Sequence, residues 1–141
     1  MPYATGIVLA VLTGSMARLA GFDRDRAFYP TLVIVIASYY VLFAAMGGST
    51  HVLLVESIAM TVFACIAIVG FRSSLWLVAA ALAGHGAFDL VHDRLVSNPG
   101  VPAWWPSFCF AVDVLLAVFL SWLLRRGALR ARGTGLASAV G

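Results

Sequence analysis

Three ionisable side chains recur at helical spacing in residues 84–93, which read Gly-His-Gly-Ala-Phe-Asp-Leu-Val-His-Asp. His85, Asp89 and His92 stand at i, i+4 and i+7, so a helix would place all three on one face. The residues before them are apolar enough for a membrane-spanning helix, and an ionisable group in hydrocarbon is costly unless it is paired. The spacing therefore predicts a polar site inside a membrane protein.

Two more carboxylates, Glu56 and Asp113, lie in other apolar segments. A carboxylate deep in a membrane must be protonated, paired with a cation or bound to a metal. A purely structural polar network that fixes the register of the helices would use the same residues. For Asp89, Glu56 and Asp113 we favour a functional site, whereas His85 is equally well explained as a neutral imidazole bonded to a neighbouring helix.

These residue types are suited to acid–base chemistry. Two carboxylates in a pocket of low dielectric share a proton, and a neighbouring histidine can act as base while the protonated acid donates. We predict Asp89 as the proton donor, Glu56 or Asp113 as its carboxylate partner, and His85 as the base or orienting group. The predicted enzyme is an isomerase, cyclase or hydrolase that acts on a small lipophilic substrate and needs no cofactor.

Three alternatives stay open. A metal-dependent enzyme would bind zinc or iron through His85, Asp89 and His92, joined by Glu56 or Asp113. A transporter would use the same groups in a proton relay or a metal-ion pathway. A structural membrane subunit would use them only to join its helices.

The five-helix plan and the His85-x-x-x-Asp89 pair resemble membrane sterol isomerases of the emopamil-binding type and small membrane terpene cyclases. The resemblance covers these two positions and the number of helices. No longer motif is shared, so the resemblance does not assign the chain to either family.

The composition excludes a soluble domain. The chain has 141 residues, of which 62% are hydrophobic and 11% are charged, and its mean hydropathy is +1.00. A soluble domain would have about a quarter of charged residues, so the lipid bilayer must be the main solvent. The nine basic residues are all arginines near the ends of apolar segments, which argues against a nucleic-acid-binding surface.

Five apolar segments are long enough to cross about 30 Å of hydrocarbon at ~1.5 Å per helical residue. They cover residues 3–21, 28–47, 50–71, 74–93 and 105–124. We predict an all-α integral membrane protein with a five-transmembrane-helix domain over 1–124 and a basic, flexible cytoplasmic tail over 125–141. Short loops favour antiparallel packing of consecutive helices, and a homo-oligomer is compatible with so small a bundle.

The arginines predict the orientation. Eight of them fall in the first loop, the third loop and the tail, and only Arg94 falls on the other side. The positive-inside rule then places the N-terminus outside and the C-terminus inside, as in a multi-pass protein of a cell membrane such as the bacterial inner membrane. The start of the chain lacks a basic region, so we read the first segment as a retained helix.

This orientation sets the depth of each polar residue. Glu56, His85, Asp89 and Asp113 fall about 6–12 Å below the outer boundary. His51 and His92 are predicted at the boundary itself, and Tyr39 and Tyr40 are predicted to serve mainly in packing. Two free and buried thiols are expected, because Cys65 and Cys109 differ in depth by more than a disulfide can span.

Overall fold

The structure is a computed structural model that describes residues 1–24 and 26–129. It consists of five α-helices: α1 (Pro2–Ala20), α2 (Phe28–Gly47), α3 (Thr50–Arg72), α4 (Leu75–Leu95) and α5 (Trp105–Arg125). Each is long and apolar enough to cross a membrane. The predicted all-helical bundle of five such segments is confirmed, and every predicted boundary lies within two residues of the observed one. Most of the predicted tail, residues 130–141, lies outside the described part of the chain.

Local sequence signals set the ends of these helices. The Ser49 hydroxyl accepts a hydrogen bond from the backbone N–H of Val52 and so caps α3. Ser74 occupies the same position before α4 and accepts from the N–H of Trp76. The helix α1 ends at Gly21, whose φ of 79° lies in the left-handed region that glycine adopts without strain.

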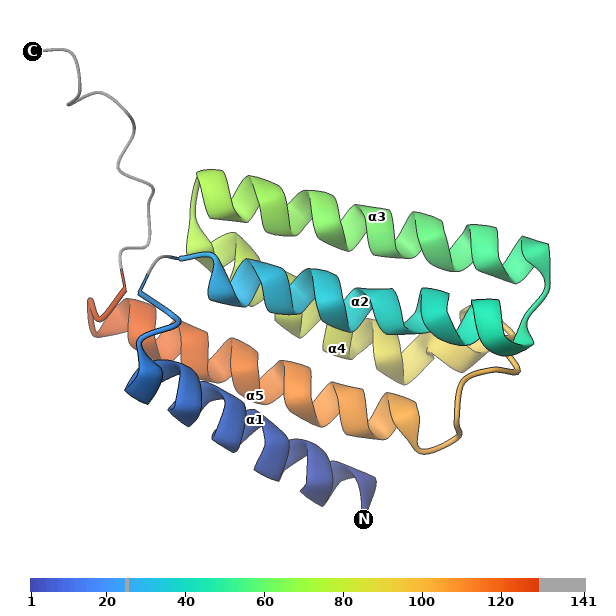
Figure 1. Ribbon diagram of the computed structural model, residues 1–141, viewed down its shortest axis with the longest axis horizontal. Coiled ribbons are helices and arrows are strands. Elements are labelled where there is room, and N and C mark those ends of the chain that lie inside the picture. Colours follow the sequence, from blue (N-terminus) through green and yellow to red (C-terminus); the bar gives the residue numbers. More distant parts are fainter. Residues whose placement is uncertain (25, 130–141) are drawn as a thin grey trace, which may run out of the picture.

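The first and last helices lie side by side (Figure 1). We predicted that consecutive helices pack together, and this is wrong for α1, whose main contacts are with α5. The buried residues of α1 are all small: Gly6, Ala10, Gly14 and Ala17. A Cβ atom at Gly6 would lie 2.5 Å from the carbonyl oxygen of Phe108, so only glycine permits this approach. Small residues drive such close packing between membrane helices, and here they select α5 as the neighbour of α1.

The remaining contacts place α4 between α5 and α3, while α2 packs on α3 and also touches α4 (Figure 1). The helix α3 is the most peripheral and buries only Glu56, Ala67 and Gly70. These residues stand at i, i+11 and i+14 and therefore share one face. Large apolar side chains cover the outside of the bundle, and ionisable ones gather within it, as expected for a membrane protein.

Candidate functional site

Buried polar side chains gather near one end of the bundle, where α2 ends and α3 and α5 begin; we call this the site end. They are Tyr40, Glu56, His85, Asp89, His92, Asn98 and Asp113. Four of the five helices, α2 to α5, and the loop between α4 and α5 contribute to this set. All four residues predicted as catalytic, Glu56, His85, Asp89 and Asp113, are at most 2% exposed.

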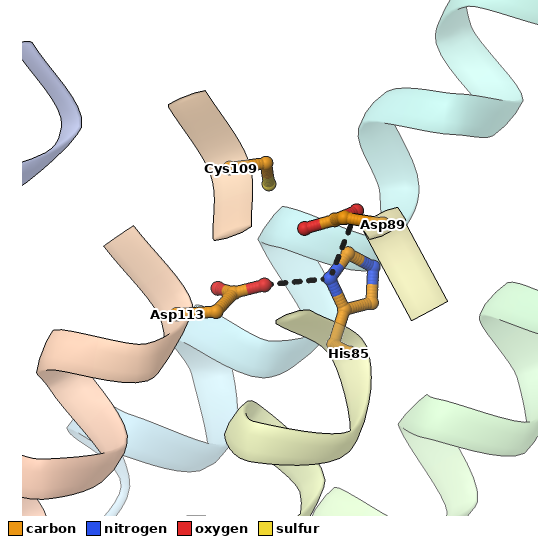
Figure 2. Close-up of side chains that lie close together, drawn as sticks. All are labelled: His85, Asp89, Cys109 and Asp113. Atoms are coloured by element: carbon orange, nitrogen blue, oxygen red, sulfur yellow. Dashed lines mark hydrogen bonds and ion pairs between the residues drawn. The ribbon is translucent and has the colours of Figure 1, made fainter. Parts of the chain in front are cut away.

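The centre of the site is the His85 cluster, which consists of His85, Asp89, Cys109 and Asp113 (Figure 2). Two helices contribute one pair of residues each, spaced i and i+4. His85 and Asp89 come from α4, and Cys109 and Asp113 come from α5. Residues four apart stack on one helical face, so two adjacent helices present two residues each. One nitrogen, oxygen or sulfur atom from each side chain lies within 4.8 Å of all the others.

His85 is held by the carboxylates of this cluster. Its Nδ1 lies 2.7 Å from Oδ2 of Asp113 and 3.7 Å from Oδ1 of Asp89 (Figure 2). The second ring nitrogen, Nε2, lies on the far side of the imidazole from Asp113 (Figure 2). Asp113 therefore fixes the orientation of the ring and leaves Nε2 free of the two acids.

A glycine allows α4 and α5 to approach each other beside this cluster. A Cβ atom at Gly86 would lie 3.4 Å from the Cβ of Asp113 and 3.3 Å from a methyl group of Val114. By contrast, a Cβ atom at Gly84 would meet nothing within 4 Å. The spacing of the two helices at the level of His85 thus depends on the absence of a side chain at Gly86.

Tyr40 belongs to the site, although it was predicted to serve mainly in packing. Its hydroxyl donates a hydrogen bond to Oδ1 of Asp89 at 2.7 Å. Its ring stacks on the His92 imidazole with a centroid distance of 3.9 Å. The sequence carries no signal for the direction in which the side chain of Tyr40 points.

Beside the His85 cluster lies a second interaction, the Glu56–His92 pair. Nε2 of His92 lies 2.8 Å from Oε1 of Glu56, and the Asn98 amide donates to the same oxygen at 2.9 Å. Glu56 was one of two predicted partners for Asp89, but it pairs with His92, and Asp113 is the carboxylate that lies in the cluster with Asp89.

His92 lies near the end of α4, and it is fully buried within the protein. The loop after α4 folds back over it: Asn98 also donates to the backbone carbonyl of Tyr40 at 3.2 Å. Gly100 lies against the end of α2, where a Cβ atom would collide with the carbonyl oxygen of Phe43. Asn98 is a site residue that the sequence reading missed, since an Asn-Pro-Gly stretch indicates only a turn.

At the site, three buried carboxylate oxygens have no hydrogen-bond partner among the described residues: Glu56 Oε2, Asp89 Oδ2 and Asp113 Oδ1. The ion-pair partners of these acids are His85 and His92, so three carboxyl groups face two imidazoles. A buried carboxylate without compensation is costly. The arrangement therefore fits either carboxyl groups that share protons or a bound cation.

The site is closed toward the interior of the bundle. A small recess beside the His85 imidazole is lined by Tyr40, Glu56, Phe63 and Phe88, among others, and is too narrow to admit a water molecule. The Phe63 ring meets the His85 ring edge to face, with centroids 4.8 Å apart. Phe63 of α3 thus packs directly against the imidazole of His85.

Three other candidate residues lie at or beyond the edge of the site. His51 and Tyr39 are exposed, and Asp93, whose side chain is 75% exposed, places its Oδ1 3.4 Å from Nδ1 of His92. Both cysteines are free, as predicted, but only Cys109 is buried. Cys65 is exposed because it lies on the outward face of α3, so the prediction of a second buried thiol is wrong.

The His85-x-x-x-Asp89-x-x-His92 spacing accounts for one helix of this arrangement, and the remaining groups come from segments far away in the chain. Asp113 and Cys109 enter through the packing of α5 on α4, and Tyr40 and Glu56 enter through α2 and α3. No protein-family model, no curated protein and no solved structure matches the chain.

Proposed function

We propose that the chain is an intramembrane enzyme that carries out acid–base chemistry on a small lipophilic substrate. The observation that carries this proposal is the position of His85, whose Nδ1 is bonded to Asp113 while Asp89 lies beside the same nitrogen. A base oriented by one carboxylate and flanked by a second is the arrangement that proton transfer requires.

Each group has a distinct role in this proposal. Asp89 is the proton donor: Tyr40 and His85 lie at Oδ1, and the unpartnered Oδ2 lies toward Cys109 (Figure 2). His85 is the base, and Asp113 stabilises the imidazolium that forms when Nε2 accepts a proton. Asp113 thus takes the part of carboxylate partner, and Glu56 pairs with His92 outside the cluster.

An isomerisation illustrates how the protons balance. The proton of the Asp89 carboxyl passes to one carbon of a substrate double bond, and His85 Nε2 removes a proton from a neighbouring carbon. Once the product has left, the imidazolium gives up its Nε2 proton to water and Asp89 takes up a proton from water, so that His85 returns to its starting tautomer and solvent hydrogen enters the next substrate. The double bond has moved, and the enzyme is restored without a net gain or loss of protons.

The test uses purified protein in liposomes made from a total lipid extract of its expression host, incubated in D2O. Proton transfer to carbon adds one deuterium to a lipid, which mass spectrometry detects. We expect such a lipid with the wild-type protein and with His51→Ala, which removes an exposed histidine, and none with His85→Ala. Failure of the wild-type protein to label any lipid, or equal labelling by His85→Ala, would contradict the proposal.

A metal-dependent enzyme is the second candidate, and Cys109 is the observation that favours it. Cys109 completes a set of one nitrogen, two oxygen and one sulfur donors, which suits zinc or iron. The predicted ligand His92 is not part of this set, because it pairs with Glu56. A metal ion would neutralise the two aspartates and would act there as a Lewis acid.

Elemental analysis decides between the two candidates. The metal version predicts about one zinc or iron ion per chain, retained in Cys65→Ser and lost in Cys109→Ser. The two substitutions remove equivalent thiols, one exposed and one in the cluster. Protein without metal that still deuterates a lipid would exclude the metal version.

We also propose that the site faces the outer leaflet, with the N-terminus outside and the C-terminus inside. Six arginines lie at the end of the bundle opposite the site end, in the last turns of α1, α3 and α5 and in the nearby loops: Arg18, Arg24, Arg26, Arg72, Arg125 and Arg126. Among the described arginines, only Arg94 lies at the site end. The positive-inside rule places the arginine-rich end in the cytoplasm of a cell membrane.

A further inference from the structure

An apolar groove of about 340 Å³ runs between α1, α2 and α5 and reaches the candidate site. Its lining includes Leu9, Leu32, Tyr39, Trp105, Cys109 and Leu116. Two larger grooves, between α1 and α5 and between α4 and α5, contact no residue of the His85 cluster. This groove therefore differs from the two others in its position beside the His85 cluster.

Cys109 connects the groove to the chemistry. Its side chain lines the groove, and its sulfur lies within 4.8 Å of oxygen atoms of Asp89 and Asp113. A wall one side chain thick therefore separates the outside of the bundle from two carboxylates, each with an unpartnered oxygen. The inner recess admits no water, so the groove is the more open approach to these acids.

We propose that the groove binds one alkyl chain of a membrane lipid and that the substrate reaches Asp89 through it, past Cys109. This inference rests on the proposed function for the chemistry, but not for the binding. The groove extends along α5 from Trp105 to Leu116, about 16 Å at ~1.5 Å per residue, which suits a single extended chain. Leu9 and Val35 on its rim are about half exposed, so the groove opens sideways toward lipid.

The polar groups of the groove determine the direction in which the alkyl chain of the lipid runs. The Tyr39 phenol and the Trp105 indole lie at the site end, and the lining toward Leu32 and Leu116 is apolar apart from Thr13. The indole N–H of Trp105 is buried and has no acceptor among the described residues. An ester, hydroxyl or carbonyl oxygen of a lipid would provide one.

This direction restricts the substrate class. Cys109 lies one helical turn from Trp105, about 6 Å along α5. A lipid with its oxygen at Trp105 therefore presents the first few carbons of its chain to Cys109 and Asp89. The inferred substrate is a lipid of the leaflet at the site end whose reacting carbons lie close to its polar group.

Photo-crosslinking in proteoliposomes tests this inference. The probes are two phosphatidylethanolamines with a diazirine on one acyl chain, placed near the ester in one and near the terminal methyl group in the other. We expect the first to label residues around Tyr39 and Cys109, and the second to label residues around Leu32 and Leu116. Both labels should decrease several-fold in Leu9→Trp, which fills the groove with a larger side chain.

Val118→Trp is the matched control, because Val118 is also exposed and lines the two grooves that do not reach the cluster. It should leave the labelling of Cys109 unchanged. Equal labelling of all grooves, or no effect of Leu9→Trp, would overturn the inference. Selective labelling without deuteration of any lipid would support lipid binding in the groove and contradict the proposed function. Deuteration that Leu9→Trp leaves unchanged would show that the substrate does not reach Asp89 through the groove.

Discussion

Tyr40 contacts Asp89 and His92 at the same time, through a 2.7 Å hydrogen bond from its hydroxyl and a 3.9 Å stacking contact of its ring. A single side chain of α2 thus joins the His85 cluster to the Glu56–His92 pair. Any change at Tyr40 acts on both, and its two contacts can be separated by substitution.

Tyr40→Phe keeps the ring and removes the hydroxyl. Asp89 then loses its only hydroxyl donor within the bundle, and we expect a loss of about 1–2 kcal/mol in the free energy of unfolding. Unfolding in mixed detergent measures this loss, and Tyr39→Phe, which changes an exposed tyrosine, is the control. Equal stability of the two variants would show that the Tyr40–Asp89 bond contributes nothing.

Asp113→Asn should preserve the packing and impair catalysis. The amide has nearly the same shape, but it cannot stabilise an imidazolium on His85. We expect the rate of lipid deuteration to fall about 10²–10⁴-fold, the usual contribution of positioned acid–base groups. A variant with normal activity would remove Asp113 from the mechanism.

Asn98→Ala should loosen the loop over His92, because Asn98 holds both Tyr40 and Glu56. We expect faster hydrogen–deuterium exchange in residues 96–104 and modification of His92 by a water-soluble histidine reagent. Ser97→Ala, at the adjacent exposed position, should have neither effect. If His92 remains protected in Asn98→Ala, the loop is held by other contacts.

Gly86→Leu should separate α4 and α5 at the level of His85, since even a Cβ atom there would lie 3.3–3.4 Å from α5 side chains. We expect lower thermal stability and loss of lipid deuteration. Gly84→Leu adds the same side chain where nothing lies within 4 Å, and it should retain both properties. Similar behaviour of the two variants would argue against close helix contact at Gly86.

The proposed topology predicts opposite sides for the loop after α4 and the C-terminal segment. A membrane-impermeant maleimide should label Ser97→Cys from outside intact cells and Gly133→Cys only after lysis. Buried Cys109 and lipid-facing Cys65 should react little in either case. Labelling of both introduced cysteines from outside would contradict this orientation.

The sequence was sufficient for the five helices and for the level of the acids along the bundle. Long apolar runs, serine caps and glycine turns mark where each helix begins and ends, and the fixed rise per residue converts a position into a depth. Burial of Glu56, His85, Asp89 and Asp113 near one end of the bundle follows from these two facts. The distances between these side chains do not follow from them.

The sequence does not determine how each helix is rotated about its axis or which helices it packs against. All faces of α3 are apolar, so its sequence does not distinguish the lipid-facing Cys65 from the inward-facing Glu56 by hydrophobicity. The packing of α1 on α5 depends on the fit of Gly6 against the Phe108 carbonyl, a contact between distant segments. Asn98 acquires its role only when the loop folds back onto α2 and α3.

The central claim is that Asp89 transfers a proton to a lipophilic substrate, and lipid deuteration in D2O by two matched variants tests it most directly. Asp89→Asn removes the buried acid that lies beside His85 and Tyr40. Asp93→Asn removes an exposed acid one helical turn away, which lies beside His92 and outside the His85 cluster. We predict that Asp93→Asn deuterates the same lipid as the wild-type protein and that Asp89→Asn is inactive while its thermal stability is retained. Deuteration by Asp89→Asn at the wild-type rate would contradict the proposed mechanism.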